Sequence, residues 1–222
     1  MPSRNASSRT PLTRERVLRA AVDLDHREGL GALTMRRLGA ELDVEAMSLY
    51  KHVAGKEAIL DGIVELVVGE IEIPSEEADW KGAMRRRAVS ARQVLGRHPW
   101  AIGLLESRSA MGPNVLRYLD TIIGSLRSAG FSPKDAAHAF WLLDSYVYGH
   151  VVQETSMRFG SAEERAESPE STLAPTSTSD YPHLVELMEH ALVSRYSIDA
   201  EFEFGLELVL DALEQTATRA AG

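Results

Sequence analysis

Apolar residues recur along this chain every three or four positions, and the strict alternation of a half-buried strand is rare. This spacing predicts helices almost throughout, separated by Gly and Pro signals. In the first third of the chain the expected helices are residues 13–28, 34–42, 46–53 and 56–73, and Pro74 marks a boundary. Beyond it the expected helices are residues 80–96, 100–107, 113–129, 133–156, 182–196 and 199–219. The predicted fold class is therefore all-α.

The pattern also divides the chain into a small N-terminal head and a larger helical domain. Residues 1–11 are polar and rich in Ser and Arg, which predicts a disordered basic arm. Residues 12–56 form the predicted three-helix head, and residues 57–73 form a connecting helix. Residues 74–222 are predicted to form the larger domain, in which the charged, low-complexity stretch 160–180 is typical of a mobile loop.

Charge is distributed unevenly between these parts. The net charge of −9 argues at first against nucleic acid, but residues 1–56 carry a net +3 and the rest of the chain carries −12. Charges more than about a Debye length (~10 Å) away are screened, so phosphate binding depends on the local field of the contacting face. A basic head before an acidic domain is therefore compatible with DNA binding.

The composition also indicates the cellular compartment. The chain has no Cys, which excludes disulfides and thiolate metal sites and fits a reducing cytoplasm. No apolar run approaches the roughly 20 residues that span a bilayer, and no signal segment opens the chain. We therefore expect a cytoplasmic protein that does not associate with a membrane.

The second and third helices of the head, with their tight turn, are typical of a helix-turn-helix. In this motif one helix crosses the phosphates and the next enters the major groove of DNA. The outer face of the third helix offers hydrogen-bond donors for phosphates and base edges and apolar atoms for thymine methyl groups. These residues are Met47, Ser48, Tyr50, Lys51 and His52. Thr34 and Lys56 lie at helix N-termini, where backbone N–H groups bind phosphates.

Residues 34–57 (TMRRLGAELDVEAMSLYKHVAGKE) resemble the DNA-binding signature of the tetracycline-repressor (TetR) family, most specifically from Leu49 to Lys56. One departure is Asp43, because the family usually has Gly in the turn, but Asp tolerates the left-handed conformation better than most residues. The resemblance implies that Arg36, Ala46, Met47, Ser48, Tyr50, Lys51 and His52 face the groove, and that Thr34, Tyr50 and Lys56 hold phosphates. The alternative is a plain three-helix fragment with Tyr50 and His52 on its surface, but several independent positions would then match by coincidence.

The rest of the chain resembles the same family more loosely, through short segments that include His98-Pro99-Trp100 and Gly112-Pro113-Asn114. The resemblance implies a homodimer that binds a double-stranded DNA operator and a small-molecule effector.

The predicted helix 133–156 is apolar almost all round, so it must be covered on more than one side. The last helix has a seam formed by Phe202, Leu206, Val209 and Leu213. In the family these two helices of each subunit form the dimer interface; an intramolecular bundle is the alternative.

The resemblance also places an effector pocket in the larger domain. The residues expected to line it are Trp100, Leu104, Leu105, Glu106, Met111, Val115, Leu119, Trp141, Ser145 and Tyr148, although each also suits an ordinary core. Tetracycline-binding members coordinate the drug's metal through a His where a gap-free alignment puts Glu106, and use a Glu where it puts Gln153. These differences argue against tetracycline–magnesium as the inducer. We predict no resident metal or cofactor, and expect a moderately large, partly apolar effector.

The function that the sequence favours is that of a repressor released by an inducer. An activator of the same family would share every DNA-binding feature. A helical small-molecule-binding module or an enzyme without DNA function is the alternative from another class. The sequence contains no nucleophile elbow, phosphate-binding Gly loop or zinc-protease motif. The one cluster of titratable groups on an apolar helix is Asp144, His150 and Glu154, and the His150–Glu154 spacing favours a hydrogen bond over a metal site.

Overall fold

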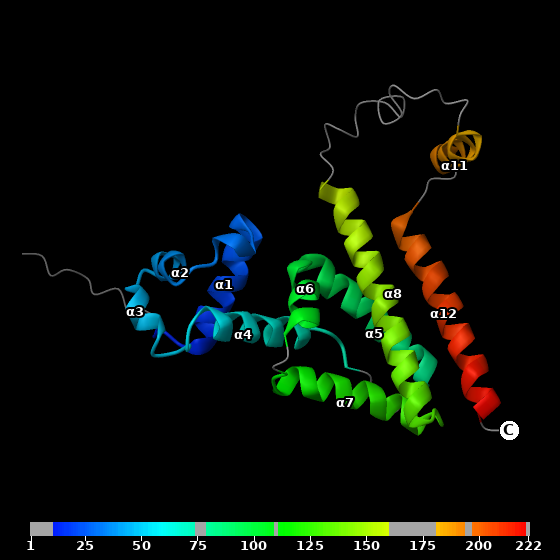
Figure 1. The fold of residues 1–222 in the computed structure, drawn as a ribbon, viewed down its shortest axis with the longest axis horizontal. Helices are drawn as coiled ribbons and strands as arrows, with labels where there is room; N and C mark the ends of the chain where they lie inside the picture. The colour runs from blue at the N-terminus through cyan, green and yellow to red at the C-terminus, as the bar shows by residue number, and fades with distance from the viewer. Residues whose placement is uncertain (1–10, 74–78, 109–110, 160–180, 194–196, 221–222) are drawn as a thin grey trace, which may run out of the picture. The chain divides into compact units, whose positions relative to one another are not determined.

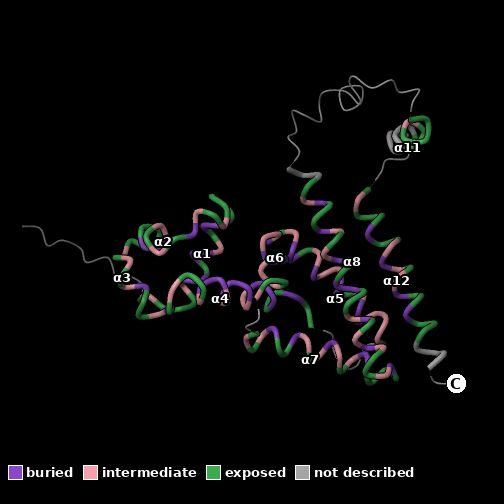
Figure 2. Tube along the Cα trace, viewed as in Figure 1, coloured by how far each residue is buried: buried purple, intermediate pink, exposed green. Residues whose placement is uncertain are grey.

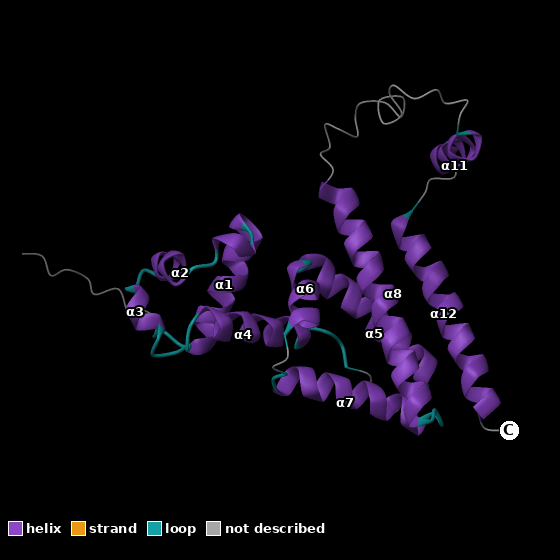
Figure 3. Cartoon of the chain, in the orientation of Figure 1, coloured by secondary structure: helices purple, strands orange, loops and turns teal. Residues whose placement is uncertain are grey.

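The computed structural model describes residues 11–73, 79–108, 111–159, 181–193 and 197–220. Secondary structure in these ranges is helical and includes no strand, which confirms the predicted all-α class (Figure 3). The chain divides into two compact units. The predicted basic arm and the predicted loop 160–180 lie outside the described residues, except for Pro11.

The first unit comprises Met1–Ile71 and Trp100–Leu119. Its helices are α1 (Arg14–Glu28), α2 (Met35–Glu41), α3 (Ala46–Leu49), α4 (Lys56–Val68), α6 (Trp100–Ser107) and the start of α7 (Pro113–Ser128), with a short 3-10 turn η1 (Leu30–Ala32) (Figure 1). Helix α1 packs against α2 and α4, and α4 packs against α6. The core contains fully buried Val17, Leu18, Leu24, Leu33, Leu38, Leu49, Ile59 and Ile63.

The second unit comprises Glu72–Pro99 and Asp120–Gly222. It holds α5 (Trp80–Arg97), the end of α7, α8 (Pro133–Phe159), α11 (Pro182–Val193) and α12 (Ile198–Ala220). Helix α5 packs against α8, and α12 packs against both. Its core residues include Ala83, Met84, Ala88, Leu95, Ala139, Leu143, Val147, Phe202, Leu206 and Leu210.

The units differ from the division at residue 74 that the sequence suggested. Helix α6 and the start of α7 group with the head, because α6 packs on α4 and its residues Trp100 and Leu104 pack on the hydrophobic core of the head. A linear reading cannot detect this return of the chain, since the contacts join residues that are far apart in sequence.

Two predicted helices are shorter than expected. The recognition helix was predicted to run from residue 46 to 53, but α3 ends at Leu49, and the next residues continue as tight turns in which His52 N–H donates to Leu49 O (2.9 Å). Helix α4 was predicted to reach Ile73 and ends at Val68, where Gly69 forms the C-cap. Gly is a poor helix former, which explains why the regular helix stops there.

The seam of α12 also differs by one residue. Its buried positions are Phe202, Leu206, Leu210 and Leu213, whereas Val209 is only half-buried. The helix therefore keeps the four-residue spacing for one turn more than the sequence suggested. Phe204 and Leu208 on the same helix remain exposed. Figure 2 shows exposed and buried segments alternating along α12.

No helix among the described residues is both long and apolar enough to cross a membrane. In the same ranges the side chains form no group of three or more His, Asp or Glu that is arranged to hold a metal ion.

Candidate nucleic-acid interface and ligand-binding residues

Helix α2 begins directly after Thr34, which the sequence placed at a helix N-terminus. The Thr34 hydroxyl accepts a hydrogen bond from the Arg37 backbone N–H (3.1 Å), which satisfies one of the first unpaired N–H groups of the helix. Thr34 and Arg36 are both exposed. The cap therefore leaves this helix end and the neighbouring Arg36 side chain accessible.

The turn between α2 and α3 depends on two unusual backbone positions. Asp43 adopts φ 55°, the left-handed conformation that the sequence predicted for it. Gly39 lies so close to the next segment that its carbonyl accepts from Val44 N–H (2.9 Å) and an added Cβ would lie 2.9 Å from Val44 O. The absence of a side chain at Gly39 is what lets α3 approach α2.

Helix α3 is fixed to the head by its apolar side. Leu49 is fully buried, and Val53 in the following turn is 4% exposed. The opposite side carries Met47, which is 75% exposed, and Tyr50, which is 49% exposed. A rigid attachment on one side and large exposed side chains on the other suit a helix that enters a groove of DNA.

The remaining predicted DNA-binding residues frame this face. Lys51 is exposed, and Lys56 is exposed at the first position of α4. Ala46, Ser48 and His52 are half-buried. All of the predicted DNA-binding residues thus lie in one segment of the first unit, on α2, on α3 with its following turn, and at the start of α4.

The side chain of Arg37, the residue after Arg36, forms ion pairs with acidic residues of this chain. Its guanidinium donates to the Glu28 carboxylate and to Glu41 (3.1 Å), and Glu41 also pairs with Arg27 (2.6 Å). The hydrogen bond from Arg37 lowers the pKa of Glu28. This network, which the sequence analysis did not identify, joins α1 to α2, and only the Arg37–Glu41 spacing of four residues hinted at it.

The predicted effector residues occur in both units. In the first unit Trp100 and Leu104 are half-buried against the core of the head, Val115 is buried, and Leu105 and Leu119 are half-buried. Glu106 and Met111 are exposed. Met111 lines a pocket of about 340 Å³, together with residues of α1, α4 and the start of α7.

In the second unit the predicted effector residues follow α8. Trp141 is 61% exposed, Ser145 is exposed, and Tyr148 is half-buried with its hydroxyl 3.3 Å from the Asp144 carboxylate. Asp144 is itself buried and paired with the buried guanidinium of Arg87. The set remains a prediction, because its members fall in two separate units.

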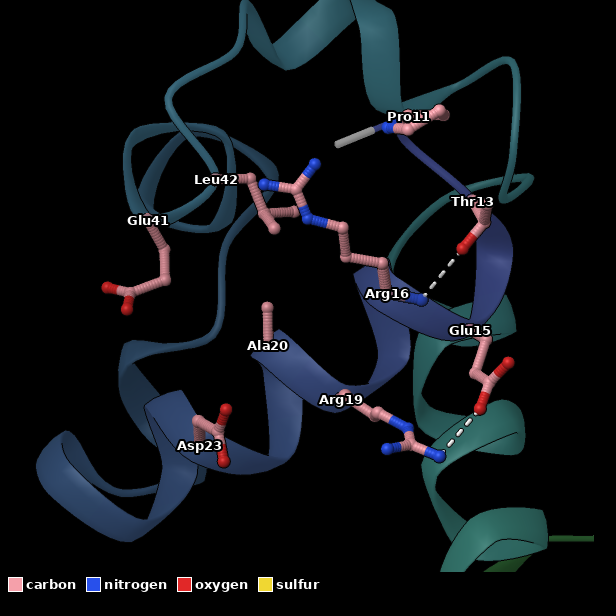
Figure 4. Close-up of a pocket in the computed structure, with 9 residues that line it drawn as sticks. All are labelled: Pro11, Thr13, Glu15, Arg16, Arg19, Ala20, Asp23, Glu41 and Leu42. Atoms are coloured by element: carbon pink, nitrogen blue, oxygen red, sulfur yellow. Dashed lines mark hydrogen bonds and ion pairs between the residues drawn. The ribbon is translucent and has the colours of Figure 1, made fainter. Parts of the chain in front are cut away.

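A larger groove, of about 590 Å³, lies on α1 and the end of α2 (Figure 4). Arg16 extends from α1 toward Leu42, and Arg19 donates to Glu15 (2.6 Å). The basic side chains are balanced by Glu15, Asp23 and Glu41, so the groove has no excess of positive charge for a phosphate. None of the predicted effector residues lines it.

His150 and Glu154, whose spacing favoured a hydrogen bond over a metal site, each have a partner on another helix. The Glu154 carboxylate accepts from Arg92 (2.9 Å), and the His150 ring meets the Phe202 ring edge-on (centroids 4.9 Å apart). Asp144 is engaged by Arg87. The sequence had grouped Asp144, His150 and Glu154, and in the structure each of them also contacts a residue of another helix: Arg87, Phe202 and Arg92, respectively.

The sequence matches two family models. The model described as "Bacterial regulatory proteins, tetR family" matches residues 17–63, and the one described as "Tetracyclin repressor-like, C-terminal domain" matches residues 73–217. This chain therefore belongs to the TetR family of bacterial transcriptional regulators.

Known members of the family are similar over nearly the whole chain. The HTH-type transcriptional repressor DrrR1 of Streptomyces coeruleorubidus is 32% identical over 223 residues, 95% of this chain and 80% of that protein. The Escherichia coli tetracycline repressor protein class C is 29% identical, covering 92% of this chain and 91% of that protein. The structure of Streptomyces coelicolor ActR in complex with actinorhodin is 30% identical with TM-score 0.75, covering 94% of this chain and 99% of that one.

These findings confirm that the chain is a helix-turn-helix transcriptional regulator. Among its relatives, DrrR1 is named a repressor and ActR has been solved with a small molecule. The family consists of transcriptional regulators rather than enzymes.

Proposed function

We propose that this chain acts as a homodimer that represses transcription in the cytoplasm, that it reads a pseudo-palindromic operator through α3 of each subunit, and that a small molecule releases it. No catalytic step belongs to this function. The single observation that carries the proposal is the anchoring of α3, where buried Leu49 lies between the exposed side chains of Met47 and Tyr50.

At the DNA, the proposed roles follow exposure and chemistry. Met47 and Tyr50 offer apolar surface to base edges and thymine methyl groups, while Lys51 and Lys56 offer ammonium groups to phosphates. Arg36, rather than Arg37, is the free guanidinium of α2 for a groove contact, because Arg37 is held by Glu28 and Glu41.

Dimerisation is supported by the apolar residues that α8 and α12 leave exposed. Trp141, Leu142 and Val152 of α8 and Phe204 and Leu208 of α12 are each between 46% and 65% exposed. Single exposed apolar residues are normal, but this many on two long helices that pack together is typical of an interface. A dimer formed through both helices carries two recognition helices, and dimers of this motif bind half-sites about one helical turn of DNA apart, or a small multiple of it.

For the effector we propose a partly apolar molecule of the size of actinorhodin or minocycline. ActR of Streptomyces coelicolor has been solved with actinorhodin, and a variant of TetR from Acinetobacter baumannii AYE, 25% identical with TM-score 0.67, has been solved with minocycline. The predicted pocket residues are mostly apolar or aromatic, which suits such a ligand. A ligand releases the operator only through different affinities for the two states of the dimer.

The deciding experiment is the selection of bound duplexes from a random DNA library at two salt concentrations. A salt-sensitive pseudo-palindrome is expected, because phosphate contacts release counterions and the dimer reads two half-sites. Replacing both Tyr50→Ala and Lys56→Ala should weaken binding to the recovered site at least about tenfold. Selection of no preferred sequence by folded, dimeric protein would refute the function.

Recovered operator DNA then allows the effector to be sought. Operator binding is measured by fluorescence anisotropy while actinorhodin, minocycline and related compounds are titrated. A reporter gene placed behind the recovered site tests the sign of regulation, since removal of a repressor raises expression. Reduced expression on removal would identify an activator instead.

A further inference from the structure

Two side chains fasten the chain segments after α6 to helix α4, within the first unit. Arg108, directly after α6, donates through Nε to the Asp61 carboxylate and through one terminal nitrogen to the carboxylate and backbone carbonyl of Glu57 (both 3.0 Å). The Arg108 side chain is only 16% exposed. The hydrogen bond to Asp61 raises the pKa of Arg108, so this guanidinium remains charged. Such forked, partly buried contacts fix geometry better than a single surface pair.

The second attachment is Glu65, one helical turn beyond Asp61 on α4. Its two carboxylate oxygens accept from the backbone N–H groups of Asn114 (2.8 Å) and Val115 (3.1 Å), the second and third residues of α7. The Asn114 side-chain amide in turn donates to the Glu65 backbone carbonyl (3.0 Å). Glu65 therefore caps α7 from another helix, and its negative charge suits the positive end of the helix dipole.

The residues directly before α7 cannot cap it, so Glu65 does so from another helix. The residue before α7 is Gly112, which has no side chain with which to cap the helix, and Pro113 has no N–H to satisfy. A Cβ at Gly112 would occupy the position of the Glu65 carboxylate. Gly112 thus keeps open the space that the carboxylate fills.

We propose that Glu65 and Arg108 are positioning residues that hold α4 in the conformation that binds operator DNA. They act through α4, which begins with Lys56, the proposed phosphate ligand. They attach α4 to segments that carry predicted effector residues, among them Leu104 and Met111. An effector that moves these segments must break these hydrogen bonds or carry α4 with them. The inference rests on the proposed function and names the contacts through which operator affinity is set.

The sharpest test is Glu65→Gln, measured without effector on the duplex selected from the random library. Glutamine has the same shape but only one side-chain oxygen, so one of the two N–H bonds to α7 is lost. We expect operator binding about tenfold weaker, the factor that corresponds to losing one hydrogen bond to a charged group. General electrostatics predicts the opposite sign, because removing a negative charge strengthens attraction to phosphates.

The chain offers matched controls. Glu207 on α12 accepts a forked pair of hydrogen bonds from Arg85 of α5, in the second unit. Glu207→Gln removes the same charge as Glu65→Gln, and Arg85→Ala removes the same charge as Arg108→Ala. Both controls should leave operator affinity within about twofold, whereas Arg108→Ala should weaken it. Gly112→Ala changes no charge but displaces the carboxylate, so it should weaken binding as Glu65→Gln does.

Hydrogen exchange separates positioning from a loss of fold. In Glu65→Gln, exchange should accelerate at Asn114, Val115 and along α4, while α1, α2 and α3 keep the protection of the unaltered protein. Operator affinity that is unchanged or tighter in Glu65→Gln overturns the proposal, as does equal weakening by Glu207→Gln. If the unaltered protein selects no duplex at all, the proposed function fails by itself. Unchanged exchange of α4 in Glu65→Gln would then independently overturn the attachment.

Discussion

The close approach at Gly39 makes a quantitative prediction for Gly39→Ala. A Cβ at this position would lie 2.9 Å from Val44 O and 3.2 Å from both N and Cα of Ala46. All three are backbone atoms, so rotation of a side chain cannot make room. Alanine must therefore push the turn and α3 away from α2.

The expected cost follows from three contributions. Forcing a methyl group into a packed site costs about 1–3 kcal/mol. Losing the hydrogen bond from Val44 N–H to Gly39 O costs about 1 kcal/mol more, while the better helix propensity of alanine returns about 1 kcal/mol. The free energy of unfolding of the head should fall by about 2 kcal/mol. Because α3 also shifts, operator affinity should fall at least about tenfold, the factor for 1.4 kcal/mol.

Urea denaturation followed by circular dichroism, together with operator binding by fluorescence anisotropy, measures both effects. Gly124→Ala is the matched control, since Gly124 is also helical but has no heavy atom within 4 Å of an added Cβ. It should raise stability by about 0.5–1 kcal/mol and leave operator affinity unchanged. If Gly39→Ala were as stabilising as Gly124→Ala and bound operator normally, the account of the turn would be refuted.

Three further predictions concern the second unit. Asp144→Asn leaves the Arg87 guanidinium buried beside a neutral amide and should lower the free energy of unfolding by about 3 kcal/mol in urea denaturation. Burial lowers the pKa of His150 below 6.5, the ordinary value for histidine, so the unfolded chain takes up this proton at higher pH than the folded one. Melting temperature should therefore fall as the pH drops below about 6.5, and His150→Gln should make that dependence shallower. Phe204→Glu combined with Leu208→Glu should convert the dimer to a monomer in sedimentation, because both side chains are more than half exposed in a single chain.

Each of these three has an outcome that contradicts it. A loss of less than about 1 kcal/mol in Asp144→Asn would mean that the buried pair is dispensable, as exposed pairs are. An identical pH dependence in His150→Gln would assign the acid sensitivity to other groups. A double Glu variant that still sediments as a dimer would exclude this face of α12 from the interface.

The DNA-binding head was predictable because its determinants are local. Thr34 caps α2 through a bond to Arg37 three residues later, and Asp43 supplies the left-handed turn at the position where the family usually has Gly. Burial of Leu49 and exposure of Met47 follow from helical spacing alone. Sequence patterns report such short-range relations directly.

The ends of the helices were less predictable. Helix α3 stops at Leu49 although the apolar pattern continues to Val53, because the chain tightens into turns that still bury Val53. A 3-10 turn, in which hydrogen bonds join residues three apart, places apolar side chains on nearly the same side as a turn of α-helix does. Apolar spacing therefore indicates which residues are buried better than it indicates where a helix ends.

Polar contacts between distant segments were beyond a linear reading. Glu154 has a possible partner four residues away, yet it binds Arg92, whose guanidinium approaches from α5. Glu65 and Asn114 are separated by 49 positions and meet only because α6 and the start of α7 return to α4. In the sequence, Gly112-Pro113-Asn114 indicates a helix start without an obvious cap. The missing cap is informative. The first N–H groups of a partly buried helix need hydrogen-bond acceptors, and when the local sequence offers none, an acceptor must come from another part of the chain. Glu65 supplies that acceptor and so connects α4 to the start of α7. In the proposed mechanism, a ligand that moves this segment acts on α4 through Glu65 and Arg108.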